Sequence, residues 1–264
     1  MRPRGPRAEE SLEQAIWVGY GLLVGVCWVL GARAFLAARR SRSPIDWALA
    51  AVTVFAGGFG CPLTFVPSLL PLEPAQKAHV LAAGIGGLGL ASIALYLALW
   101  RFFRPRSVIA ALICSAGTFA IAWSLLAEVV TAGFAWGRDR RWLALGGIAC
   151  WLPYAWGALE LLVESRRDLS AASPREDERS QRTYRLYSLA LGAVALVYPF
   201  GLVSAYRHPG GPHPRAVVAA VAATGFAAAT AAAIGFYWGS RRSRASRARS
   251  PASPSEARSS ARST

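Results

Sequence analysis

Charged side chains are scarce in this chain, which argues against an ordinary soluble protein. Only 16% of its 264 residues are charged, against about 25% in a typical soluble domain. Four widely separated cysteines without a CxxC pair exclude a disulfide-stapled secreted module and give little support to a redox or metal site. Because 54% of the residues are hydrophobic, disorder over the whole chain is excluded as well.

The hydrophobic residues form long runs along nearly the whole chain. Each run holds about 22 residues, which as a helix crosses a hydrocarbon core about 30 Å thick. The runs are continuously apolar rather than alternating, and this pattern favours helices over the strands of a barrel. We therefore predict an all-α polytopic membrane protein with a seven-transmembrane-helix bundle over residues 15–238. The predicted spans are residues 15–36, 45–66, 79–100, 108–131, 142–163, 184–206 and 216–238.

Basic residues divide unequally between the two sides of this predicted bundle. Nine of the 29 lie in the N-terminal segment and in the connections after the second, fourth and sixth runs, and twenty lie on the other side. Positive charge concentrates on the cytoplasmic side, so we predict the N-terminus outside and the C-terminus in the cytoplasm. Arginine outnumbers lysine 28 to one, which is typical of a high-GC bacterial genome. The predicted location is therefore the bacterial inner membrane, since outer-membrane proteins are barrels.

The two ends of the chain differ in composition from the apolar runs. Residues 1–14 form a predicted extracytoplasmic segment. Residues 239–264 hold seven arginines and one glutamate and form a predicted disordered cytoplasmic tail. Each arginine beside a membrane attracts anionic lipid by about 1 kcal/mol, so we expect the tail to bind anionic lipids of the bilayer and not nucleic acid.

The first apolar run has an alternative interpretation as a cleaved signal peptide. Arg2, Arg4 and Arg7 precede it, and a small-residue pattern, Ala-Arg-Ala at residues 32–34, lies near its end. Acidic residues just before the run and its spanning length favour a retained helix.

Two ionisable residues are predicted to lie inside the hydrocarbon region. Such a residue costs about 2.5 to 3.5 kcal/mol at the centre of a spanning helix and is a functional candidate by default. Glu160 lies about 10 Å from the midplane of the fifth run, and Arg33 lies at a similar depth on the same side. Our hypothesis is that the two pair, or that burial keeps Glu160 protonated. Snorkelling of Arg33 to the headgroups is the alternative.

A second group of residues is a candidate ligand-binding pocket. Glu128 lies near the outer end of the fourth run. Trp123, Trp151, Tyr154 and Tyr198 could surround it with a partly aromatic cavity that is open to the outside. Ordinary packing between helices would use the same residues.

Prolines and glycines interrupt several of the runs. Pro62, Pro153 and Pro199 are predicted helix kinks. Residues 84–89 match the GxGxxG pattern of dinucleotide-binding loops, but no strand precedes them and no acidic residue follows about 20 positions later. We therefore predict that these glycines serve close packing of helices.

Motifs for catalysis and cofactor binding are missing. The chain has no HExxH, no GxSxG and no paired aspartates, and its three histidines all fall on the outer side rather than within the membrane, so we predict no catalytic residue, no enzyme activity and no cofactor. His208 and His213 flank a Pro/Gly turn that contains no cysteine or carboxylate, so we predict no metal site. Lys77, the one lysine, lies in a connection, which excludes a retinal Schiff base.

Two loose motifs carry a resemblance to known membrane proteins. One is Trp-Arg-Phe-Phe-Arg-Pro at residues 100–105, and the other combines Tyr154, Trp156 and Glu160. With the helix count, they make residues 15–238 similar to a family of uncharacterised seven-helix bacterial membrane proteins and, more distantly, to seven-helix sensory regions that precede some histidine kinases. This resemblance implies a receptor-like sensor or a membrane scaffold.

The predicted functions differ in the interior that each requires. Since no output domain fits into this chain, a receptor or scaffold would act through a cytoplasmic signalling partner or as a homo-oligomer. A receptor predicts a closed interior with an outward cavity around Glu128. The alternative is a small-solute transporter or channel with a proton- or ion-linked Glu160, and it predicts a continuous polar path between the two carboxylates.

Overall fold

The computed structural model describes residues 6–42, 44–132, 140–166, 174–207 and 213–249, and their regular structure is entirely helical. The second span is built from four short helices, and every other span is one helix. In chain order the elements are α1 (Pro6–Ser41), α2 (Pro44–Ala51), η1 (Val52–Gly60), α3 (Cys61–Phe65), η2 (Val66–Ser68), α4 (Pro74–Phe103), α5 (Val108–Ala132), α6 (Arg140–Glu164), α7 (Pro174–Arg207) and α8 (Arg215–Arg249).

Seven stretches of these helices are long and apolar enough to cross a membrane, so the predicted number of spans is confirmed. Several helices extend past the predicted spans. α1 begins at Pro6 and α8 continues to Arg249, so residues 6–14 and 239–249 are helical. The physical reason is that helix propensity does not end where apolarity ends: alanine and arginine are strong helix formers, and proline fits the first helical position.

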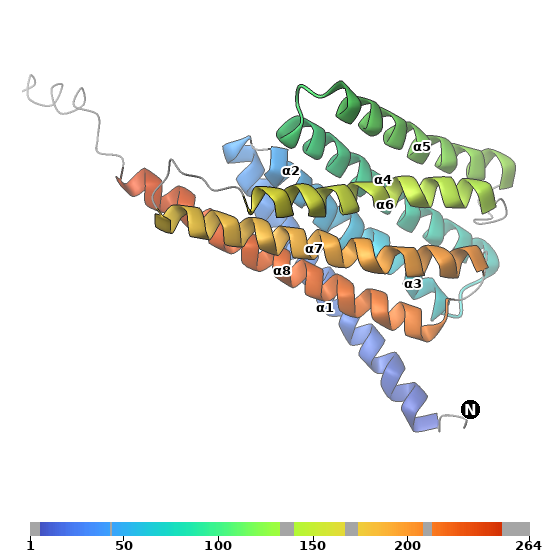
Figure 1. Ribbon diagram of the computed structural model, residues 1–264. Coiled ribbons are helices and arrows are strands. Elements are labelled where there is room, and N and C mark those ends of the chain that lie inside the picture. The colour runs from blue at the N-terminus through green and yellow to red at the C-terminus, as the bar shows by residue number, and fades with distance from the viewer. Residues whose placement is uncertain (1–5, 43, 133–139, 167–173, 208–212, 250–264) are drawn as a thin grey trace, which may run out of the picture.

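Consecutive spans run in alternating directions and pack side by side (Figure 1). α7 packs between α6 and α8, and α4 contacts the second span, α5 and α6. α1 crosses the bundle obliquely against the second span and α8, and its first turns project beyond the other helices (Figure 1). We call the end of the bundle where α1 begins the amino end, and the end toward which α8 runs the tail end.

Large apolar side chains cover much of the outer surface of the bundle. Leu196 is 75% exposed, and Val108, Phe119 and Phe200 are exposed as well. By contrast, many buried positions hold alanine, as at Ala34. Small residues inside and large apolar residues outside are what helices packed within lipid require, since water would penalise the outer surface.

The second span changes its helical geometry beside Pro62. Residues Val52–Gly60 form a π-helix, and the N–H of Cys61 donates to the carbonyl of Ala56, five residues earlier. Pro62 has no N–H to donate to the carbonyl four residues before it, so α-helical geometry could not continue through this point unchanged. The predicted kink at Pro62 thus coincides with a break in the α-helix, whereas α6 and α7 run through Pro153 and Pro199 as continuous helices.

The glycines of α4 lie against the backbone of the second span. A Cβ atom at Gly84 would stand 2.6 Å from Thr64 Oγ1 and 2.7 Å from the Thr64 nitrogen. A Cβ atom at Gly87 would stand 2.9 Å from the carbonyl oxygen of Phe55 and 3.3 Å from Gly60 Cα. Gly84 and Gly87 therefore serve close helix packing, as predicted, whereas Gly86 has no atom within 4 Å of the corresponding Cβ position.

Candidate functional site

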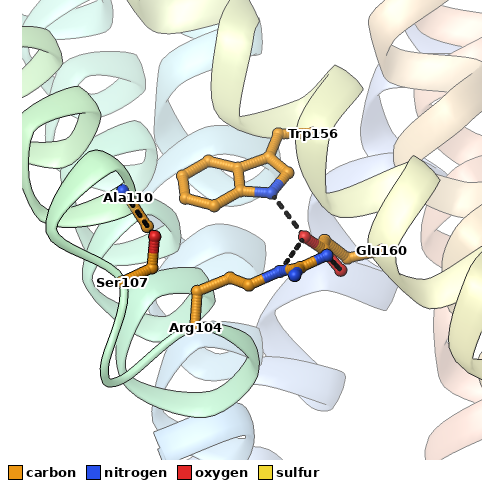
Figure 2. Close-up of polar contacts among 5 residues, drawn as sticks. All are labelled: Arg104, Ser107, Ala110, Trp156 and Glu160. Carbon is orange, nitrogen blue, oxygen red and sulfur yellow. Dashed lines mark hydrogen bonds and ion pairs between the residues drawn. The ribbon is translucent and has the colours of Figure 1, made fainter.

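Arg104 is positioned at the tail end of α4 by the proline that follows it. A residue before proline is disfavoured in helical geometry, and Arg104 accordingly ends the helix with φ −134° and ψ 46°. Its N–H still donates to the carbonyl of Trp100 at 3.1 Å. The side chain thus leaves the helix axis beside α6 (Figure 2).

Glu160 on α6 receives three hydrogen bonds in this place (Figure 2). Arg104 Nε donates to Oε1 at 2.9 Å and Arg104 Nη2 donates to Oε2 at 3.3 Å, so the guanidinium binds the carboxylate with two bonds. Trp156, one helical turn before Glu160, donates its indole N–H to Oε1 at 3.0 Å. The Glu160 side chain is 13% exposed and that of Arg104 is 51% exposed. The hydrogen bond and the negative charge of Glu160 raise the pKa of Arg104 above its ordinary value.

The predicted pairing of Glu160 with Arg33 is wrong, because a different arginine, Arg104, pairs with Glu160. Arg33 is exposed on α1, and α1 packs on the second span and α8, whereas α6 packs on α4, α5 and α7. Neighbouring helices decide which arginine reaches the carboxylate. The structure therefore joins Glu160 to Arg104, and in doing so brings the two motifs of the sequence resemblance together.

The turn that follows Arg104 is also held by specific bonds. Ser107 precedes α5, and its hydroxyl oxygen accepts a hydrogen bond from the N–H of Ala110 at 3.2 Å (Figure 2). This is the N-cap interaction that satisfies one of the free donors at a helix start. The short connection between α4 and α5 is thereby held at its start by the bond from the Arg104 N–H to Trp100 and at its end by the bond between Ser107 and Ala110.

Two cavities are lined by residues of several helices of the bundle. The first has a volume of about 140 Å³, lies toward the amino end and reaches Trp142 and His213. The second has a volume of about 170 Å³, lies toward the tail end and reaches Phe103 and Leu161. Their linings are dominated by apolar side chains and include no Asp, Glu, Lys or Arg. The residues that line both cavities are Cys61, Leu88, Val194, Tyr198 and Gly225, so the two cavities meet there.

A pair of tyrosines lies where the cavities meet. The rings of Tyr154 and Tyr198 are stacked, with centroids 6.5 Å apart and an angle of 23° between their planes. Tyr154 is 1% exposed, and its hydroxyl has no hydrogen-bond partner in the protein. Ser92 is a polar neighbour of this hydroxyl, and the Ser92 hydroxyl donates to the carbonyls of Leu88 and Cys150, at 2.8 and 3.1 Å.

The structure brings only part of the predicted pocket together. Tyr154 and Tyr198 line the cavities. Trp151 lines neither cavity and donates its indole N–H to the carbonyl of Ala195 at 2.8 Å. Trp123 is 45% exposed on the outside of the bundle, where it stacks on Phe119. Neither tryptophan therefore lines the two cavities that the tyrosines line, and the pocket around Glu128 stays a prediction.

Glu128, the predicted centre of that pocket, lies in α5, and its side chain is outside the part of the chain that the structure describes. The cavities instead use residues that sequence reasoning missed, such as Val194 and Gly225. Nothing in their local sequence distinguishes them from other small or apolar residues of a spanning helix.

His213 lies at the amino end of the first cavity. Its Nδ1 is 2.9 Å from the Ser204 hydroxyl, and its ring lies 4.9 Å from the ring of Phe65. His208, its predicted counterpart, is outside the described residues. Within the described ranges, no group of three His, Cys, Asp or Glu residues is arranged to hold a metal ion.

The chain was compared with protein families, curated proteins and solved structures. None of them matches. The likeness to seven-helix bacterial and sensory membrane proteins therefore remains a prediction that rests on helix number and on the two motifs around Arg104 and Glu160.

Proposed function

We propose that this chain is a receptor-like membrane protein that binds a small apolar molecule inside its seven-helix bundle. The observation that carries the proposal is the pair of adjacent apolar cavities. An apolar cavity of about 150 Å³ inside a protein is large enough to bind benzene, so each of the two cavities has room for an apolar group of about that size. Cavities lined by apolar groups with few polar atoms are typical of ligand sites.

The location and partners follow from the charge pattern. The bundle lies in a bacterial inner membrane with its N-terminus outside, because basic residues are concentrated on the opposite side. The arginines of residues 239–264 bind anionic lipids on the cytoplasmic face. The bound state is passed to a cytoplasmic signalling partner or to a second copy of this chain, since the connections are too short to hold an output domain.

A transporter for polar solutes has less support from the geometry. Glu160, the residue that would couple such transport to a proton or ion, lines neither cavity and is engaged by Arg104 and Trp156. The two cavities together reach from His213 to Phe103, which is the extent that a carrier would need. However, an apolar molecule crosses a bilayer without a carrier. Apolar cavities therefore support a binding function better than a transport function.

Filling the junction of the cavities tests the proposal. Val194 lines both of them, so Val194→Trp should remove saturable binding of radiolabelled diphenylmethane to the protein in lipid nanodiscs. Val203→Trp is the matched control, because Val203 is 50% exposed on the same helix and should leave binding unchanged. The proposal is wrong if wild-type protein binds no more probe than empty nanodiscs, or if both variants bind like wild type.

A further inference from the structure

The hydroxyl of Tyr154 is a buried donor without a partner, and this makes it the most informative polar atom of the interior. Among the described residues, two buried side-chain oxygens have no hydrogen-bond partner, those of Tyr154 and Thr230. Thr230 lines neither of the two cavities, whereas Tyr154 lines the second. A donor of this kind is costly to leave unsatisfied, so an acceptor atom placed against it gains a full hydrogen bond.

The position of this hydroxyl limits which ligand could use it. Tyr154 stacks on Tyr198, which lines both cavities. Tyr154 itself lines the second cavity, so its ring lies beside a residue that the two cavities share.

We propose that the ligand is an uncharged molecule in which a carbonyl oxygen lies between two apolar parts, as in a diaryl or aryl alkyl ketone or an ester. Tyr154 donates to the carbonyl, and each apolar part occupies one cavity. This inference rests on the proposed function and names the ligand class of that same site. A charged ligand does not fit, because burying an unpaired charge in such a lining is strongly unfavourable and no Asp, Glu, Lys or Arg lines it.

Benzophenone and diphenylmethane form a matched pair of probes for this proposal. Both carry two phenyl rings, and only benzophenone has a carbonyl between them. In nanodiscs, wild-type protein should bind both probes saturably. Irradiation of bound benzophenone should attach it covalently to peptides that line the cavities, such as those containing Leu88 or Val194, and diphenylmethane should compete with this labelling.

Tyr154→Phe isolates the hydrogen bond, since it removes the hydroxyl and retains the ring. The variant should bind benzophenone about tenfold more weakly, the loss expected for one hydrogen bond, and should bind diphenylmethane as wild type does. Tyr206→Phe is the control, because Tyr206 is 43% exposed and lines neither cavity. The thermal unfolding midpoint of Tyr154→Phe should not fall, because the substitution removes a buried donor that has no partner.

The outcomes separate this inference from the proposed function. Unchanged benzophenone affinity in Tyr154→Phe, or an equal loss for both probes, overturns the role of the hydroxyl while the apolar site stands. Binding of diphenylmethane without benzophenone overturns the ligand class in the same way. If wild-type protein binds neither probe, the proposed function itself fails.

Discussion

Pro105 shows how one residue determines the geometry of a cluster whose members are distant in sequence. It ends α4 at Arg104, and the guanidinium then reaches Glu160 on α6. The sequence identified Glu160 correctly as a charge within an apolar run. It could not identify the partner, because the contacts between helices are not encoded in any local pattern.

The ion pair predicts a specific coupling between two substitutions. Arg104→Ala and Glu160→Ala should each lower the thermal unfolding midpoint, because each leaves the other side chain without its partner. The unfolding midpoint of the double variant should fall by clearly less than the sum of the two single decreases, since the second substitution removes an interaction that is already broken. Differential scanning fluorimetry in detergent measures the cycle.

Arg106→Ala is the control for that cycle, since Arg106 is an exposed arginine of the same turn. It should give additive losses when combined with Glu160→Ala. Strict additivity for Arg104 with Glu160 would show that their contact contributes nothing to stability.

Two glycines of α4 predict opposite effects of the same substitution. Gly84→Ala places a methyl group within 3 Å of backbone atoms of the second span and should destabilise the fold by about 1 to 3 kcal/mol. Gly86 has no atom within 4 Å of the corresponding position, so Gly86→Ala should be neutral or stabilise by up to about 1 kcal/mol through helix propensity. Unfolding in a denaturing detergent measures both changes, and equal losses for the two variants would contradict the packing described above.

At the scale of whole elements, the number and approximate extent of the spans were predictable, because an apolar run of spanning length has few alternatives. The rotation of a helix about its axis was harder to predict. In α8 Ala223 and Ala227 are exposed, whereas Ala222 and Ala229 are buried. A helix with alanine on every face has no hydrophobic periodicity that could show which side packs inward.

The packing of α1 bears on the alternative of a cleaved signal peptide. Ile16, Tyr20 and Leu23 are buried against α8, where Val218 and Ala222 lie. Removal of this helix would expose that contact, so we expect the mature protein to keep it. Protein expressed with a tag ahead of residue 1 should retain the tag in the purified membrane fraction, as read by immunoblot and intact mass. A mass that begins near residue 35 would instead indicate cleavage.

At the scale of the whole molecule, the account depends on seven crossings of one membrane. The described helices are long and apolar enough for them, and the exposed apolar side chains match a lipid environment. The interior was less predictable from the sequence. Its cavities are assembled from single residues of several helices, and only the two tyrosines of the predicted pocket take part.

An odd number of crossings places the two ends of the chain on opposite sides, so a topology measurement is the most direct test. Fusions of the full chain to a reporter that is active only outside the cytoplasm, and to one that is active only inside, should be made at each terminus in a bacterial host. We predict an external N-terminal reporter and a cytoplasmic C-terminal reporter, in agreement with the basic residues. Activity of both termini in the same compartment would contradict the seven-span account.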